Sequence, residues 1–223
     1  MRTTFAARQF TPAEVSDAQL ERILENARFA PSGGNRQGWK VIVVRDPATK
    51  AALIPIIEPT AQRYVAQVTA GEAPWNTINP TRLSATDIAA TPVPSAMIQA
   101  LCTAPVLLIV VVDLSVVASF DSELDRVGVI SGASVYPFVW NILLAARNEG
   151  LGGTLTTFAA GEEGALKNLL NVPEQFAFAA MLPIGQPVKQ LTRLSRKPVS
   201  QFAVQETFDG PVLGGATGET IDE

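Results

Sequence analysis

The sequence predicts a single α/β domain in which buried strands are flanked by helices. Residues 39–44 and 106–113 are runs of β-branched and aliphatic side chains, typical of strands, and the second run alternates so little that it indicates burial on both faces. Residues 134–150 place apolar side chains around most of a helical circumference, which indicates a central helix. With 223 residues and no repeat or low-complexity linker, one domain over 1–223 is expected.

The remaining elements follow from local signals. Ser16 and Gln19 form a capping-box pattern that begins a helix, and Pro31 requires that helix to have ended. Strand 39–44 is expected to be buried and to be closed by Asp46-Pro47, before a short helix over 48–57. Further strands are expected at 151–158 and 176–185, with a short helix over 161–170 between them.

Residues 58–100 show weak periodicity and are rich in proline, threonine and alanine. Their prolines are Pro59, Pro74, Pro80, Pro92 and Pro94. A structureless stretch this long inside a compact domain is usually functional. We therefore expect a lid or an insertion at 58–100, and a C-terminal extension over 200–223 whose last part, from residue 210, is loose.

The composition excludes several classes of function. The chain has no histidine, which removes Ser/His/Asp and Cys/His nucleophilic dyads and histidine metal sites. Cys102 is the only cysteine, so neither an intrachain disulfide nor a zinc cluster can form, and we interpret it as a buried small hydrophobe. A net charge of −4 argues against a nucleic-acid or membrane partner. Chemistry in such an enzyme is usually supplied by a cofactor.

The location expected from the sequence is cytoplasmic. The first residues, 1–5, lack the apolar segment of a secretory signal peptide. The longest apolar run, 104–112, is too short to span a bilayer.

Three places combine small, hydrogen-bonding and cationic residues in predicted loops: Arg8, the segment 31–37, and the segment 152–157 with Arg193, Arg196 and Lys197 further on. Glycine lets a backbone approach a ligand, Ser, Asn and Thr bind polyhydroxyl chains, and arginine binds phosphate. Each place alone also fits a structural role: a helix-to-strand turn, a helix C-cap, or a solvated charge cluster. No Gly-x-Gly-x-x-Gly after a strand and no Walker loop is present.

In chain order, these residues resemble the FMN-dependent nitroreductase family. Its Arg-x-Phe start is matched by residues 8–10, its Ala-Pro-Ser-Gly-Gly-Asn-x-Gln-x-Trp motif by 30–39, its Gly-Leu-Gly-Gly-Thr-x-Thr-Thr motif by 150–157, and its Arg-Lys-Pro by 196–198. The resemblance covers residues 3 to about 200. Two departures stand out: Thr4-Phe5-Ala6 replaces the Arg-Arg-Ser of many members, and Gly38 replaces a proline.

The resemblance implies a role for each matched residue. Arg8 would lie beside the N1/C2 carbonyl edge of the flavin, where its charge favours the reduced cofactor. Ser32 and Asn35 would bind the ribityl chain or ring edge. Arg196 would bind the phosphate. The full set of implied cofactor-binding residues is Arg8, Ser32, Asn35, Gln37, Gly153, Thr156, Thr157 and Arg196, with the two threonines facing flavin N5.

The resemblance also implies a fold and a function. The fold is α+β, with a central mixed sheet flanked by helices, in an intertwined homodimer that holds flavin at the subunit interface. The segment 58–100 would be the lid over the flavin, and the tail would wrap the partner. The function would be an FMN-dependent oxidoreductase that takes hydride from NADH or NADPH and passes it to a nitroaromatic or quinone. Reductive dehalogenation, enoyl reduction, modification of the flavin, and a non-catalytic flavin-binding protein remain alternatives.

Overall fold

The computed structural model describes residues 1–214, apart from the side chains of Ala96, Gln99, Ala100 and Cys102. The interpretation of Cys102 as a buried hydrophobe and most of the loose end expected at 210–223 therefore lie outside the described residues. None of the helices in the described part combines the length and apolar character that a membrane span requires.

A four-stranded sheet forms the centre of the molecule, in the order β1 (Trp39–Val44), β2 (Val106–Asp113), β4 (Phe176–Gly185), β3 (Gly152–Gly153). All three strand pairings are antiparallel. The class is therefore α+β rather than α/β, and the expectation of a mixed sheet is wrong for the named strands. The one parallel pairing among the described residues is an isolated bridge from Ala6 to Gly153.

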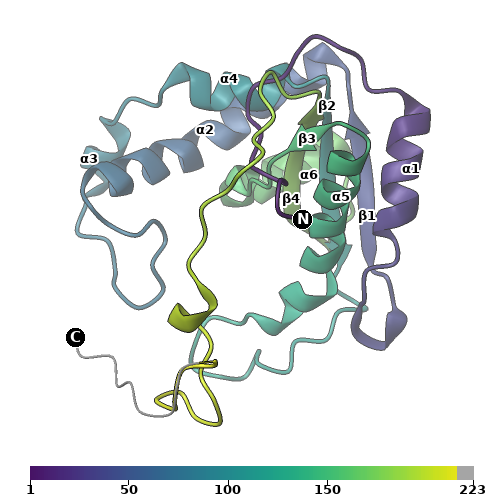
Figure 1. The fold of residues 1–223 in the computed structure, drawn as a ribbon. Helices are drawn as coiled ribbons and strands as arrows, with labels where there is room; N and C mark the ends of the chain where they lie inside the picture. The colour runs from purple at the N-terminus through teal and green to yellow at the C-terminus, as the bar shows by residue number, and fades with distance from the viewer. Residues whose placement is uncertain (215–223) are drawn as a thin grey trace.

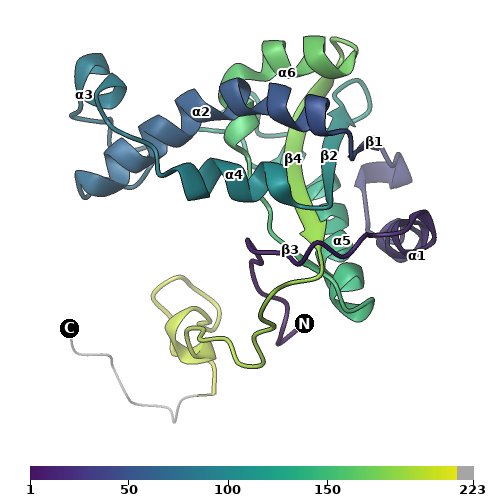
Figure 2. The same cartoon turned by 90° about the horizontal axis from the view of Figure 1, so that it is seen from above.

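Helices cover both faces of the sheet (Figures 1 and 2). On one face lie α1 (Asp17–Ala27) and α5 (Tyr136–Asn148), packed on Val106, Leu108 and Val110 of β2. On the other face α2 (Pro47–Thr69), α4 (Ser95–Thr103) and α6 (Glu163–Leu170) pack on the alternate side chains of the same strand. Because side chains alternate across a strand, β2 serves both cores, which explains its unbroken apolar run.

Shorter helical elements lie in the connections. α3 (Ala85–Ala89) precedes α4, and four 3₁₀ turns lie at Gly33–Asn35, Ile130–Ser134, Phe158–Glu162 and Val199–Gln201. α5 begins at Tyr136, two residues later than expected, with a proline in its first turn, where a missing N–H costs nothing.

Helix α2 is the largest departure from the sequence-based expectation. It runs for 23 residues through Pro55 and Pro59, where the sequence predicts a helix ending near residue 57. The side chains Leu53, Ile57 and Ala61 are fully buried against β2. Tertiary packing therefore holds the helix together across two residues that each remove a backbone donor. The expected structureless stretch at 58–100 is consequently half helical.

Two strands also differ from expectation. β1 pairs with β2 alone, so it lies at an edge of the sheet, and Val44 is its one buried residue. Val43 is 40% exposed, so the expectation of a buried strand at 39–44 is wrong. The strand expected at 151–158 is reduced to Gly152–Gly153 plus a bridge from Thr156 to Met181, because a 3₁₀ turn begins at Phe158.

The amino-terminal segment and the chain after β4 lie side by side. Thr11 N donates to Gln186 O at 2.8 Å, Val188 N to Gln9 O at 3.1 Å, and Gln190 Nε2 to Thr3 O at 2.9 Å. Beyond residue 190 the tail leaves the sheet and projects from the body (Figure 2). Phe202 and Phe208 on this projection are 68% and 100% exposed.

Candidate functional site

Arg8 and Gly153 are brought together by the amino-terminal segment. Ala7 N donates to Gly153 O at 3.0 Å, which places Arg8 just beyond the edge of β3. A Cβ on Gly153 would lie 2.5 Å from Ile184 Cδ1 and 2.6 Å from Pro183 O, so only glycine fits here. The exposed Arg8 guanidinium donates through Nη1 to Ala6 O at 3.4 Å and has no carboxylate partner in the described part of the chain. Its charge remains available to an anion.

Thr156 and Thr157 follow on the same chain segment. Thr156 exchanges both backbone hydrogen bonds with Met181, at 3.0 and 2.9 Å, which fixes its position on the edge of β4. Its side chain is half-buried, whereas Thr157 is exposed and precedes the turn Phe158–Glu162. The backbone of Thr156 is therefore fixed beside the sheet, and the exposed side chain of Thr157 follows it directly in the chain.

Ser32, Asn35 and Gln37 form one hydrogen-bonded loop. Ser32 Oγ accepts from Gln37 N at 2.9 Å, and Gln37 Nε2 donates to Asn35 Oδ1 at 3.2 Å. Asn35 and Gln37 both adopt left-handed backbone conformations, with φ of 52° and 49°. Non-glycine residues rarely adopt this region, and such residues are concentrated at ligand sites. Apart from half-buried Ser32, the loop is exposed, so its polar groups are accessible from solvent.

This loop and Gly153 lie at opposite ends of α5. Gly33 N donates to Ser134 Oγ at 3.1 Å, two residues before α5 begins, whereas Gly153 follows five residues after α5 ends. A helix of 13 residues is about 20 Å long. Within one chain the sequence-predicted site is therefore split, with Arg8, Gly153, Thr156 and Thr157 on one side and Ser32, Asn35 and Gln37 on the other.

Arg196 lies on the projecting tail. Its Nη1 donates to Ser195 O at 2.6 Å, it is exposed, and within residues 1–214 no carboxylate pairs with it. The start of the same tail is hydrogen-bonded to the segment that carries Arg8. The structure thus places Arg196 on a neighbouring segment and records no contact between the two arginines.

A cavity that the sequence did not predict opens beside Thr157. Its volume is about 420 Å³. It is lined by Thr60, Tyr64, Pro74, Trp75, Thr157, Phe158, Ala160 and Gly161. The rings of Tyr64 and Phe158 meet edge-to-face with centroids 5.6 Å apart. Thr60 and Tyr64 stand four residues apart on one face of α2, a spacing that is legible once the helix is known to continue past Pro59.

The loop after α2 is held by a buried polar network. Gln67, which is 2% exposed, donates to Glu72 Oε2 at 3.3 Å and accepts from Trp75 N at 3.2 Å. Glu72 also accepts from Thr81 Oγ1 at 2.6 Å and from Arg82 N at 2.8 Å. These hydrogen bonds, the one from Thr81 above all, lower the pKa of Glu72 below its ordinary value. The network fixes Trp75 at the cavity with φ of 49°.

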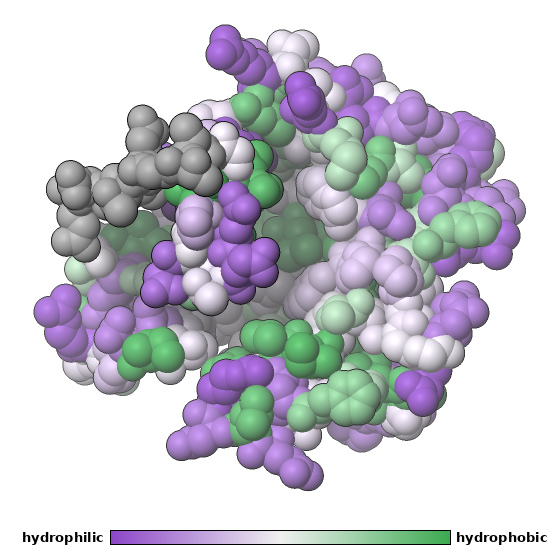
Figure 3. Space-filling view, turned by 60° about the horizontal axis from the view of Figure 1, so that its bottom comes forward, coloured by the Kyte–Doolittle hydropathy of each residue, from purple (hydrophilic) through white to green (hydrophobic). Residues whose placement is uncertain are grey.

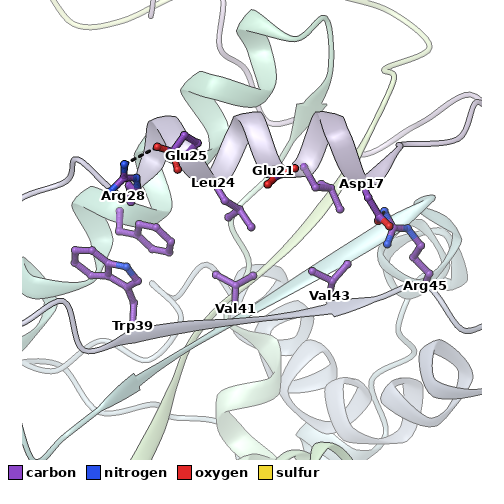
Figure 4. A pocket seen from close by; sticks show the side chains of 11 residues that line it. Asp17, Glu21, Leu24, Glu25, Arg28, Trp39, Val41, Val43 and Arg45 are labelled. Atoms are coloured by element: carbon purple, nitrogen blue, oxygen red, sulfur yellow. Dashed lines mark hydrogen bonds and ion pairs between the residues drawn. The ribbon is translucent and has the colours of Figure 1, made fainter.

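A second cavity, of about 530 Å³, lies between α1 and the edge strand β1. Figure 4 shows Leu24 above Val41, with the Arg28–Glu25 and Arg45–Asp17 ion pairs at its two ends. The rings of Trp39 and Phe138, which both line the cavity, stack with their centroids 4.6 Å apart. No sequence-predicted site residue lines this cavity.

Asp121 organises the long connection between β2 and α5. Its carboxylate is 3% exposed and accepts from Val129 N at 2.7 Å and Arg126 Nη1 at 2.8 Å, which lowers the pKa of Asp121 from 3.8 to about 2. Phe120, on the same connection, is 89% exposed. The molecule is hollowed on the face seen in Figure 3, with hydrophobic residues along both sides of the hollow.

Comparison with known protein families identifies the family of this chain. The sequence model of the Nitroreductase family matches residues 1–186. The chain belongs to the nitroreductase family. The match ends where β4 does, so it includes every sequence-predicted site residue of this family member except Arg196.

Individual relatives are distant. Human iodotyrosine deiodinase 1 is 26% identical over 211 residues, covering 90% of this chain but 63% of its own length. A protein named NADH dehydrogenase from Thermus thermophilus is 50% identical over 46 residues, or 21% of this chain and 22% of its own. The chain thus spans less than two thirds of either relative. A crystal structure of oxidized iodotyrosine deiodinase bound to FMN and 3-iodo-L-tyrosine superposes with a TM-score of 0.65 at 22% identity, covering 92% of this chain and 96% of that one. The nitroreductase fold is shared.

Proposed function

We propose that this nitroreductase-family protein is an FMN-dependent oxidoreductase that takes hydride from NADH or NADPH and reduces a small electron-poor acceptor. The observation that carries the proposal is the hydrogen bond from Ala7 N to Gly153 O, which brings the segment of Arg8 to Gly153, in the same region of the chain as two threonines and an open aromatic cavity. An unpaired cation, a close backbone approach and a cavity for an acceptor are what such a reaction requires. The family match and the partial similarity to a protein named NADH dehydrogenase support it.

The donor set fits FMN. Arg8 and Arg196 are exposed guanidiniums without carboxylate partners in the described residues, on segments joined to each other by backbone hydrogen bonds. Cations left unpaired on neighbouring segments suit a phosphate and the electron-rich edge of a flavin ring. Ser32, Asn35 and Gln37 supply the hydroxyl and amide groups that a ribityl chain requires.

FMN, when bound, supplies the capacity to accept a hydride and to pass it on. The residues of this chain would bind FMN, orient its ring and shield it from water. Arg196 would hold the phosphate, and Arg8 would place a fixed charge beside the ring. Thr156, whose backbone is fixed by Met181, and the neighbouring Thr157 would orient the reacting edge of the ring. Nicotinamide and acceptor occupy the cavity beside Thr157 in turn, with Trp75 limiting access of water.

The split site supports the proposal of a homodimer. Because the 32–37 loop and Gly153 lie about 20 Å apart along α5, both groups reach one flavin when they come from two chains. The exposed apolar side chains Phe120, Tyr136 and Trp140, at 89%, 44% and 42% exposure, suit burial against a second copy. The projecting tail, with Phe202 and Phe208, suits a segment that wraps the partner.

Reductive dehalogenation is a second candidate. The specific observation in its favour is the similarity to iodotyrosine deiodinase 1 over 90% of this chain. Incubation with NADPH or a chemical reductant and 3-iodotyrosine, followed by chromatography for tyrosine and iodide, separates this reaction from reduction of a nitro group or quinone.

Anaerobic mixing experiments test the first proposal. NADH or NADPH is expected to bleach the flavin absorption of the protein, and a quinone or nitroaromatic added afterwards is expected to restore it. The proposal fails if flavin-loaded protein is not bleached by either nucleotide while dithionite bleaches it fully.

A further inference from the structure

Arg63 is a cation that lies next to the aromatic cavity beside Thr157 without lining it, and it contacts the cavity through Trp75. Arg63 lies on α2 between Thr60 and Tyr64, two residues of the cavity wall. Its guanidinium carbon lies 4.7 Å from the centroid of the Trp75 ring, in a cation–π contact. Its Nε is buried and has no hydrogen-bond partner within residues 1–214, and no described carboxylate pairs with it.

The walls of the cavity add no negative charge. The residues that line it are aromatic, aliphatic or hydroxyl-bearing, and none is acidic. The nearby Glu72 is a carboxylate, but it pairs with Arg82, whose Nε lies 4.0 Å from Glu72 Oε1, and it also accepts from Thr81 Oγ1 and Arg82 N. The guanidinium of Arg63 is separated from the cavity by the Trp75 ring. Because no described carboxylate pairs with it, its charge gives the cavity a positive electrostatic potential.

Trp75 is built into its position. Its φ of 49° is unfavourable for a tryptophan, and the buried Gln67 holds its backbone N–H. Figure 1 shows the loop that carries it between α2 and α3. Arg63 at its ring and Gln67 at its backbone thus hold Trp75 in the wall of the cavity, whose other aromatic residues are Tyr64 and Phe158. Aromatic walls favour a flat ring, and we call this cavity the slot.

We propose that this slot selects planar aromatic anions, such as aromatic carboxylates and phenolates, over neutral or cationic rings, and that Arg63 is the residue that sets this preference. The ring of the ligand stacks between Trp75 and Tyr64. Its anionic group lies toward Arg63, and the hydroxyls of Thr60 and Thr157 are available to its polar substituents. The inference rests on the proposed function, because the slot is the acceptor site only if the flavin ring lies beside Thr157.

Binding of two matched probes to the oxidised, flavin-loaded protein tests the inference without turnover. 4-Nitrobenzoate and 4-nitrobenzamide share ring and nitro group and differ in charge, and calorimetry without a reductant gives both affinities. The charge of Arg63 acts on the carboxylate of the probe across the Trp75 ring, at a distance of about 8 Å. At an effective dielectric of about 20 to 40, Coulomb's law predicts that the benzoate binds about five- to thirtyfold more tightly than the benzamide. A ratio of one or below in the wild-type protein overturns the inference.

Variants assign the preference to Arg63. Arg63→Gln is expected to bring the ratio close to one, and Arg63→Lys to retain part of it. Lys40→Gln is the control, because it removes one positive charge at an exposed residue of β1 that lines neither cavity and pairs with no described carboxylate, and it is expected to keep the full ratio. If Lys40→Gln lost the ratio as Arg63→Gln does, the preference would be an effect of net charge rather than of Arg63, and the assignment would be overturned.

The proposed function can fail separately. A protein that is bleached by NADH and reoxidised by a quinone, yet binds benzoate and benzamide equally, retains the function and loses this inference. If the protein prefers the benzoate but its flavin is bleached by neither nucleotide, the proposed function is wrong and the chain still has a site that binds aromatic anions. If Arg63→Gln does not fold, the wild-type ratio and Arg63→Lys still decide the matter.

Discussion

Gly153→Ala is the perturbation whose magnitude follows most directly from the structure. The new Cβ would lie 2.5 Å from Ile184 Cδ1, 2.6 Å from Pro183 O and 3.1 Å from Leu143 Cδ2. Leu143 and Ile184 are core side chains, at 5% and 0% exposure, and Pro183 O is backbone, so the strand edge must move. Overpacking of this kind costs about 1–3 kcal/mol.

The consequences can be measured as thermal stability. For a chain of this length, each kcal/mol shifts Tm by about 2–4 °C, so Gly153→Ala is expected to lower the Tm of the apoprotein by about 2–12 °C. The loss should be greater with FMN bound, because Gly153 O holds the segment that carries Arg8. Gly164→Ala in α6 is the control, since a Cβ there meets nothing within 4 Å, and its Tm should be unchanged or raised. Equal Tm values for wild type and Gly153→Ala would refute the close packing.

Three further predictions concern single charges. Arg196→Ala is expected to weaken FMN binding about ten- to a hundredfold, as for loss of a charge-assisted hydrogen bond, while riboflavin binding changes little; equal losses in titrations with both ligands would assign Arg196 a structural role. Arg8→Gln should lower the two-electron potential of bound FMN by a few tens of millivolts, about 30 mV for each 1.4 kcal/mol, and an unchanged potential in spectroelectrochemistry would place Arg8 away from the ring. Asp121, whose folded pKa lies below its ordinary 3.8, contributes stability above about pH 4 that is lost as the pH falls toward 2. Asp121→Asn should be less stable at pH 6 and lose less between pH 5 and 2.5 in urea titrations; identical pH profiles would contradict the role of the carboxylate.

The parts of the fold that sequence predicts well are those with consistent local signals. β2 and β4 have the expected bounds, because both are apolar runs bounded by turn residues. α1 begins at its capping box, in which Ser16 Oγ accepts from Gln19 N at 3.2 Å. α2 could not be predicted, because Pro55 and Pro59 are locally unfavourable and the compensating contacts come from β2, about fifty residues away along the chain.

The sequence selects candidate site residues one by one, but it does not predict how they are arranged in space. Motif order selects Arg8 and Gly153, and the structure joins their segments through Ala7. The distance between the 32–37 loop and Gly153 depends on which end of α5 each one contacts, and no local pattern encodes that. The aromatic cavity joins residues 60–75 to residues 157–161, and its two halves meet only in the folded chain.

Identification of the chromophore tests the central claim most directly. Protein purified from cells, or reconstituted with FMN, is expected to be yellow and to release a compound that co-migrates with FMN in chromatography, at close to one per chain. A colourless protein that takes up no FMN on reconstitution would contradict the account. So would a chromophore other than FMN at the same stoichiometry.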